Sequence, residues 1–441
     1  MAVQIPFTKS LDTDNSVAVS EDKFLSSLLQ QFQVKDNQPQ WLKAIRQQAS
    51  AWVSRLQTPS KKDENWRFID LGDLVQTNFI LANGVDAVSK HPSYPEAKNT
   101  RLVFVNGFYN AELSDISGLP EGIYVGNVDN LPENYNLQQY FAQQHGAQDV
   151  FTALNTAGSQ DIAIVWVAKN IVVETPIHLV FISQAADTPS FSQPRTLIVA
   201  ETSSSFSLIE EYTGEGTYFT NAVTEIWLQD NAEIKHTRLQ QESLNSFHIA
   251  KTAVSQNRDS RYTINEINFG GKLYRHNPEI LQQDIQTTTN LNGLTVATEK
   301  QVADTHSIVA LTKPQGTTNQ LHKCIVGDRA HSIFNGKIFV PKEAQLTDAT
   351  QLNRNLLLSS KARVDTKPEL QITADNVKCS HGATVSQLEA EEIFYLRSRG
   401  LGEADASQLL IDAFAGEIIE RLDIESLKNQ ITQTIKHKIN H

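Results

Sequence analysis

A cysteine and a histidine stand two residues apart in the run VKCSHGATV, which spans residues 377–385. The cysteine, Cys379, is one of two in 441 residues, and the histidine is His381. Thiolate and imidazole groups are both common metal ligands, so the pair is typical of one part of a metal site. The same pair also suits a small buried cysteine packed beside a hydrogen-bonded histidine. The spacing leaves both interpretations open.

The local pattern predicts that both side chains share one face of a strand. Alternate residues of a strand point the same way, so Cys379 and His381 lie with Val377, Ala383 and Val385 on an apolar, buried side. Two residues of extended chain separate the side chains by about 7 Å. Two ligands do not complete a site, and the CxxC spacing of structural zinc sites is absent. Any further ligands must come from elsewhere, such as a partner chain.

A second pair, His322 and Cys324 in LHKCIV, has the mirrored spacing. It would complete a site if the fold brought it near the first pair, but the sequence does not place it there. Other chemical motifs are missing: there is no GxxxxGK[ST] run, no GxGxxG after a strand and no GxSxG. We therefore expect that this chain has no P-loop of its own and binds no nucleotide.

The hydrophobic pattern divides the chain into three regions. Residues 1–95 form an N-terminal helical region, with helices expected over 21–32 and 40–57 from apolar residues at helical spacing. Residues 96–386 carry short Val-, Ile- and Thr-rich strands separated by polar turns, and residues 387–441 form a C-terminal helical domain.

A loose repeat near the end of the middle region suggests how its strands are arranged. Similar segments begin at Ala344 and at Ala362. A repeat of about 20 residues with short strands favours a β-helix, in which each turn buries its inner face on its neighbours. An ordinary β-sandwich or barrel is the alternative, although the region from 96 to 386 is long for one sandwich.

Composition excludes several classes of protein. The chain is 40% hydrophobic and 20% charged, with a net charge of −12 and no basic block, so we expect no nucleic-acid partner. Two cysteines cannot form a disulfide framework. The N-terminus has no apolar leader, and no apolar run approaches the ~20 residues that span a bilayer. These features predict a cytoplasmic protein with no membrane contact.

The last region carries an apolar stripe that includes Leu409, Leu410, Phe414 and Ile418. A terminal helix with such a stripe either packs on its own domain or forms a docking face. The pattern alone favours packing.

The run from Phe334 to Leu401, with CSHGAT at 379–384 and IFYLRSRG at 393–400, closely resembles the SufB/SufD family of the SUF iron–sulfur cluster assembly system. The form of these motifs, with PSKKDENWRF, LVFVNGFY and FTALNTA upstream, is closer to the SufD members than to the SufB members. The resemblance implies a mainly β fold, a right-handed parallel β-helix flanked by N- and C-terminal helical regions. It also implies a complex with SufB and with the ATPase SufC, which supplies the nucleotide chemistry.

The resemblance further implies roles for particular residues. His381 would be a metal ligand at the SufB interface, where transient iron or a nascent iron–sulfur cluster is shared with SufB, and Cys379 is a second candidate. His322 and Cys324 gain no support from the resemblance and are interpreted as structural. The C-terminal helices would carry the SufC docking surface, for which the candidates are Phe394, Leu396, Arg399, Leu409, Leu410 and Phe414.

The family also suggests a mechanism, in which ATP-driven closure of SufC pulls on these helices and opens the interface to expose His381. Two alternatives remain at this point. One is a purely structural subunit without iron contact, and the other is a β-helix enzyme acting on carbohydrate.

Overall fold

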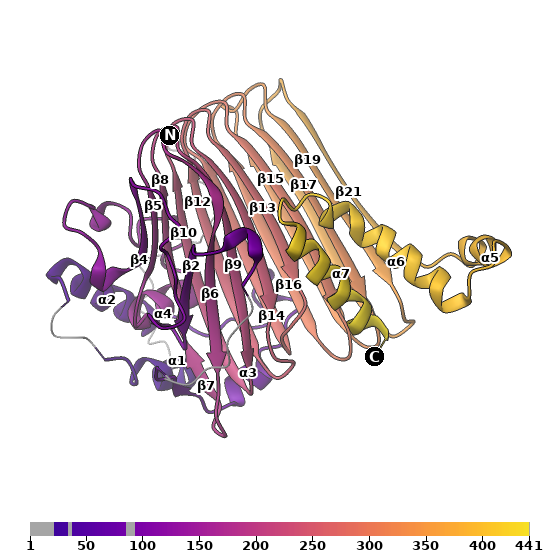
Figure 1. Ribbon diagram of the computed structural model, residues 1–441, viewed down its shortest axis with the longest axis horizontal. Helices are drawn as coiled ribbons and strands as arrows, with labels where there is room; N and C mark the ends of the chain where they lie inside the picture. Colours follow the sequence, from indigo (N-terminus) through magenta and orange to yellow (C-terminus); the bar gives the residue numbers. More distant parts are fainter. Residues whose placement is uncertain (1–21, 34–37, 85–92, 441) are drawn as a thin grey trace.

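Two parallel sheets form the body of the structure, and successive strands of the chain alternate between them (Figure 1). The computed structural model describes residues 22–33, 38–84 and 93–440. We call the eleven-stranded sheet sheet A and the ten-stranded sheet sheet B. Sheet A contains β1 (Ile80–Leu81), β4 (Ile123–Asn127), β5 (Ala163–Val167), β7 (Ser190–Ser192), β8 (Arg195–Ala200), β10 (Tyr218–Leu228), β12 (Phe247–Gln256), β14 (Leu273–Gln282), β16 (Val302–Leu311), β18 (His331–Val340) and β20 (Arg363–Ile372).

Sheet B contains β2 (Arg101–Val105), β3 (Phe108–Tyr109), β6 (Val172–Gln184), β9 (Ser205–Glu215), β11 (Glu233–Gln241), β13 (Arg261–Asn268), β15 (Thr288–Ala297), β17 (Thr317–Val326), β19 (Asp348–Leu357) and β21 (Lys378–Gln387). Each strand from β8 onward pairs in parallel with the strand two positions away in the chain. Antiparallel pairs occur at the N-terminal end, between β2 and β3 and between β4 and β5. This is the β-helix expected from the sequence.

The repeat of the coil is longer than the sequence pattern suggested. One turn runs from Phe247 to its register partner Leu273 in one place and from His331 to its partner Arg363 in another. A turn thus takes roughly 30 residues, a period typical of solenoid proteins. The shorter repeat expected from the sequence was wrong, because its two segments correspond to β19 and β20, which lie in opposite sheets. The segments look alike because each is one strand with an apolar inner face, not one full turn.

One corner of the coil is built from residues in the left-handed backbone region. Asn231, Asp259 and Gln315 have φ of 58°, 59° and 64°. The N–H of Asn231 donates to the carbonyl of Arg258 in the following turn, and the N–H of Asp259 donates to Ile285 in the same way. Left-handed φ costs roughly 1–2 kcal/mol in residues other than glycine. Each such residue here gains a hydrogen bond to the next turn, which offsets that cost and stacks the corners in register.

The inside of the coil is apolar in one part and polar in another. A continuous cluster of apolar side chains, including Ile234, Ile264 and Val309, fills one part. Buried ionisable side chains fill the other part, namely Glu210, Arg238, His248, Glu266 and His276. Buried charges require partners, so this second part of the interior is held together by polar contacts.

Helices cover the outer faces of both sheets. The expected N-terminal helices are present as α1 (Lys23–Leu29) and α2 (Gln40–Val53), although residues 1–21 of the predicted N-terminal region lie outside the described residues. The described chain before the last turns also contains α3 (Gly72–Gln76), α4 (Val150–Gly158) and the 3-10 turns η1 (Glu64–Trp66), η2 (Pro95–Ala97), η3 (Val128–Asn130) and η4 (Leu137–Gln139). Apolar residues of α1 and α4 pack against Phe219 and Phe247 on the outer face of sheet A.

The C-terminal helices are α5 (Ala390–Ser398), α6 (Glu403–Ile419) and α7 (Glu425–Asn440). Helices α6 and α7 cover sheet B, while α5 projects away from the coil at the end of α6 (Figure 1). The last region of the chain is therefore helical, as the hydrophobic pattern predicted.

Candidate functional site

The last turn of the coil ends in two strands that each have a neighbour on one side only. Strand β20 is the terminal strand of sheet A and β21 is the terminal strand of sheet B. No further turn follows in the described chain, which continues into α5. We call β20 and β21 together the open end of the coil. Both are ten residues long, and strand edges of this length present rows of unpaired N–H and C=O groups.

The open end carries Cys379 and His381 on the inward-facing side of β21. In the strand register His381 follows Gln351 of β19, and Cys379 follows Ala349. Gln351 and Ala349 are both buried inside the coil. The prediction that Cys379 and His381 share the inner face of a strand is therefore consistent with the register.

The prediction that this face is buried was wrong for His381. The imidazole is exposed, and Cys379 is half-buried against the apolar side chains that fill one part of the coil. The reason is the position of the strand: the same inward-facing column is buried at Gln351 because β21 lies over it, whereas no strand of the described chain lies over β21. Burial also raises the pKa of the Cys379 thiol, and the nearby carboxylate of Asp348 adds to the effect.

His322 and Cys324 lie deep in the coil, two strands away from β21 in sheet B. The Nε2 atom of His322 lies 3.1 Å from the hydroxyl of Thr295, and its ring stacks on Phe334 at 5.1 Å. Desolvation lowers the pKa of His322 and raises the pKa of Cys324 to about 12, so both are neutral at pH 7. Burial and these contacts support the interpretation of the pair as structural.

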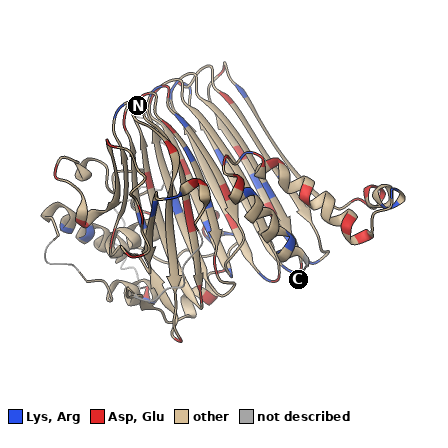
Figure 2. Ribbon diagram, viewed as in Figure 1, with Lys and Arg blue, Asp and Glu red and all other residues tan. Residues whose placement is uncertain are grey.

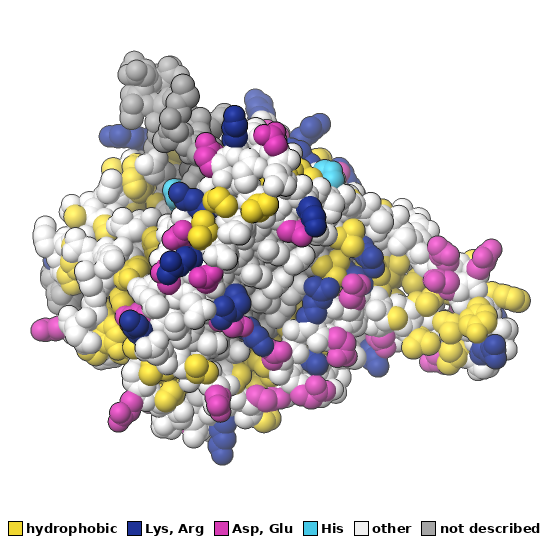
Figure 3. Space-filling view, turned by 90° about the horizontal axis from the view of Figure 1, so that it is seen from above, with side chains coloured by type: hydrophobic (Ala, Val, Ile, Leu, Met, Phe, Trp, Pro, Cys, Tyr) yellow, Lys and Arg dark blue, Asp and Glu magenta, His cyan; other side chains and the backbone are white. Residues whose placement is uncertain are grey.

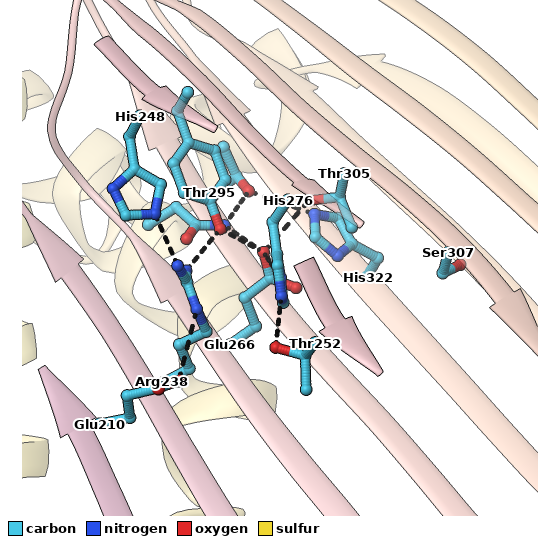
Figure 4. Close-up of polar contacts among 12 residues, drawn as sticks. Glu210, Arg238, His248, Thr252, Glu266, His276, Thr295, Thr305, Ser307 and His322 are labelled. Carbon is cyan, nitrogen blue, oxygen red and sulfur yellow. Dashed lines mark hydrogen bonds and ion pairs between the residues drawn. The ribbon is translucent and has the colours of Figure 1, made fainter. Parts of the chain in front are cut away.

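The structure also contains a buried polar cluster that the sequence did not reveal (Figure 4). We call Glu210, Arg238, His248, Glu266 and His276 the interior cluster. The guanidinium of Arg238 lies between Glu210, at 3.8 Å, and the Nε2 atom of His248, at 2.6 Å. Strand register places Glu210, Arg238 and Glu266 in one column across β9, β11 and β13. The column thus alternates in charge from one turn of the coil to the next.

Glu266 is the centre of the second half of the interior cluster. Its carboxylate accepts a hydrogen bond from the Tyr274 hydroxyl at 2.7 Å and lies 3.1 Å from Nδ1 of His276. Desolvation alone would raise the pKa of Glu266, but His276, His322 and Arg238 together lower it. Desolvation lowers the pKa of His276 to about 4 despite the neighbouring carboxylate. The Nε2 atom of His276 is 2.9 Å from the Thr252 hydroxyl.

A cavity of about 10 Å³ lies beside this cluster and is lined by Glu266, Thr305, Gln320 and His322, among others. Such a volume is close to the minimum that holds one water molecule. The part of the interior around it is therefore filled by side chains rather than hollow. The sequence does carry a signal for the interior cluster, because charged residues recur at inward-facing positions of successive strands. The length of each turn was needed to align those strands with one another.

The candidate docking residues fall into two groups. Phe394 is 74% exposed and Leu409 is 48% exposed, with Tyr395 exposed beside Phe394. Arg399 is also exposed, whereas Leu396 and Leu410 are half-buried. Figure 3 shows hydrophobic side chains gathered on the projecting end of the molecule, where α5 lies in Figure 1. An exposed aromatic patch of this kind is typical of a binding surface.

Phe414 belongs to the second group, because it is half-buried and packs on the coil. It packs against the apolar cluster under the C-terminal helices, and the Lys323 ammonium lies 4.5 Å from its ring centre. The same ammonium forms a 2.5 Å ion pair with Glu417. Figure 2 shows Lys and Arg positions on the strands of sheet B near Asp and Glu positions on the covering helices. These contacts attach α6 to β17.

Two family models together match most of the chain. The model described as the SufBD core domain of SUF-system Fe–S cluster assembly matches residues 181–414, and the SufBD N-terminal region matches residues 20–179. The chain belongs to the SufBD family. The membership expected from the sequence is thereby confirmed, and it places the chain in iron–sulfur cluster assembly.

Relatives of the SufBD family match over most of their length. An iron–sulfur cluster assembly SufBD family protein of Synechocystis is 47% identical over 94% of this chain and 95% of its own. The iron–sulfur cluster assembly protein SufD of Escherichia coli is 32% identical, over 89% of this chain and 92% of its own. The chloroplastic protein ABCI7 of Arabidopsis thaliana is 35% identical, over 90% and 86%.

Within residues 22–33, 38–84 and 93–440, no three His, Cys, Asp or Glu side chains are grouped so that they would hold a metal ion. None of the helices in these same ranges combines the length and apolar character needed to cross a bilayer.

Proposed function

We propose that this chain is the SufD-type subunit of a SUF scaffold and that its open end binds SufB. The observation that carries the proposal is the exposed, inward-facing His381 on a strand with an unpaired edge. Edges of this kind bind a partner strand through main-chain hydrogen bonds. A partner coil added in this way would continue the stack and enclose the inner face of β21. Iron or a nascent cluster at that junction would then lie between ligands of two chains.

His381 would supply one ligand for iron at this junction. An imidazole ring with a free nitrogen binds iron, and mixed Cys and His ligation of iron–sulfur centres is known chemistry. The neighbouring Cys379 is the weaker candidate because its pKa is raised, so the thiol is protonated at neutral pH. Metal ligation requires the thiolate. The remaining ligands, including the main thiolate, would come from SufB.

We call the exposed side chains of Phe394, Tyr395 and Leu409 the α5 patch. This patch would dock the ATPase SufC, which supplies the nucleotide chemistry. Phe394 and Tyr395 on α5, with Leu409 on α6, expose enough apolar surface to anchor a partner. Helix α6 links this patch to the coil through the ion pair between Lys323 and Glu417. Force on α5 would therefore reach β17, which is joined through β19 to β21. Closure of SufC would act on the open end by this route.

The test is the iron and sulfide content of the complex purified after co-expression with SufB and SufC. We expect His381→Ala to assemble normally but to retain less than about a tenth of the iron, because removing even a group that orients a ligand typically costs about 10- to 100-fold in metal affinity. Ser380→Ala is the matched control, since Ser380 is exposed on the same strand but faces the other way. Equal iron in the two variants would contradict the ligand role and leave a purely structural subunit.

A further inference from the structure

Gln351 lies directly below His381 and has a free hydrogen-bond acceptor. The two residues are register partners in adjacent strands, so both side chains face the interior. Gln351 is 1% exposed. Its amide oxygen Oε1 is buried and receives no hydrogen bond from any described residue. A buried amide oxygen without a donor costs about 1–3 kcal/mol, so this acceptor is poised for a donor close by.

The amide group of Gln351 is held in place from two directions. Its Nε2 donates to Oε1 of Gln320 at 2.8 Å, and the Nε2 of Gln320 donates to the Ser307 hydroxyl at 2.8 Å. Across the coil, the amide occupies the space that a side chain at Gly336 would fill, since a Cβ there would collide with Nε2 of Gln351. With the nitrogen occupied in this way, the oxygen is the part of the amide left to interact with the next turn.

The structure does not show His381 donating to this oxygen, but the exposed imidazole can turn about its side-chain bonds. We infer that it turns to donate its N–H to Oε1 of Gln351 and that this hydrogen bond fixes its tautomer. A neutral imidazole carries one N–H and one lone pair. When the inner nitrogen carries the hydrogen, the lone pair belongs to the other nitrogen, which then faces the open end. Histidines that bind metals are usually oriented by such an outer hydrogen bond. Gln351 is thus a positioning residue, and its relevance to iron depends on the function proposed above.

The tautomer can be measured in the isolated full-length chain without iron or partner. We would record imidazole ¹⁵N shifts of ¹⁵N-histidine-labelled protein at pH 8, assigning His381 from the signals missing in His381→Ala. We expect one tautomer of His381 to dominate in the wild type. Gln351→Met, which removes the acceptor at similar volume, should shift the ratio of tautomers by about tenfold. Gln351→Glu keeps an acceptor oxygen and should restore the wild-type ratio.

A second variant reaches the same amide without changing Gln351. Gly336→Ala places a methyl group against Nε2 of Gln351 and should displace the Gln351 amide. This change should also shift the ratio of the two His381 tautomers. The signals of His276 and His322, which are buried elsewhere in the coil, report whether each variant is folded. Ser380→Ala should leave every one of these shifts unchanged.

The outcomes separate this inference from the function on which it rests. An unchanged tautomer ratio in folded Gln351→Met would overturn the positioning role, whatever the iron content of the complex. If the ratio changes but His381→Ala keeps its iron, the hydrogen bond stands and the ligand role fails. If both roles hold, the Gln351→Met complex should lose iron and the Gln351→Glu complex should regain it.

Discussion

At the scale of single residues, burial decides which histidines respond to pH. His276 is fully enclosed beside Glu266 and Arg238, and desolvation lowers its pKa from 6.5 to about 4. Desolvation also lowers the pKa of His248 and His322. The folded chain therefore binds fewer protons than the unfolded chain between pH 4 and 6.5. The stability that His276 contributes is complete above pH 6.5 and is lost as the pH falls towards 4.

His276→Gln should make stability less dependent on pH in this window. Loss of one titrating group reduces the slope by up to one proton, or about 1.4 kcal/mol per pH unit. Urea unfolding at several pH values between 4 and 7 measures the slope directly. Ser380→Ala, which removes no titrating group, is the control and should leave the slope unchanged. An unaltered slope in His276→Gln would show that the histidine is not kept neutral by burial.

At the scale of elements, the C-terminal helices have two separate tasks. Ile411, Ala415 and Ile418 of α6 are buried against sheet B, whereas Phe394 and Tyr395 of α5 face solvent. The apolar stripe read from the sequence combined exposed Leu409 with buried Ile418, because α6 has one apolar side on the coil and another towards solvent.

The exposed face of α5 should be required for SufC binding but not for folding. Replacing both Phe394 and Tyr395 by Ser should weaken SufC binding by about 30-fold or more, since even one buried aromatic anchor often contributes about 2 kcal/mol. Calorimetric titration with SufC measures the affinity, and the thermal unfolding temperature should not fall. Val172→Ser, at a similarly exposed apolar residue on β6, should bind normally. Normal binding by the double variant would place the docking surface elsewhere.

At the scale of the whole molecule, the coil is a stack that ends without a cover in the described chain. Lys378 donates its N–H to the carbonyl of Thr347, towards the preceding turn. Bonding residues alternate in a parallel ladder, so the N–H groups of Cys379, His381 and Ala383 point to the open side. These groups are available to a partner strand.

A proline on the open side should block SufB pairing while leaving the coil folded. Ala383→Pro removes an N–H that is not used within the chain, whereas Thr384→Pro removes one directed to β19. We expect Ala383→Pro to have the same free energy of unfolding as the wild type but not to co-purify with SufB. The second should instead lower stability by several kcal/mol. Normal SufB binding by folded Ala383→Pro would argue against strand pairing at this edge.

The sequence by itself determined the class of fold, the family and the pair at residues 379 and 381. Alternating apolar residues require a strand with one buried face, and the motifs around CSHGAT are local enough to read without a structure. The repeat length was misread because neighbouring strands in sequence, β19 and β20, belong to different sheets. Local patterns do not report which strand pairs with which.

Tertiary structure alone decided the burial of each inner position and the contents of the coil. His381 and Gln351 follow the same alternation, yet one is exposed and the other buried, because a strand covers only the second. The interior cluster likewise depends on the stacking of turns that brings Glu210, Arg238 and Glu266 into one column. Contacts between residues one full turn apart are set by how the turns stack, and no local pattern in the sequence carries that information.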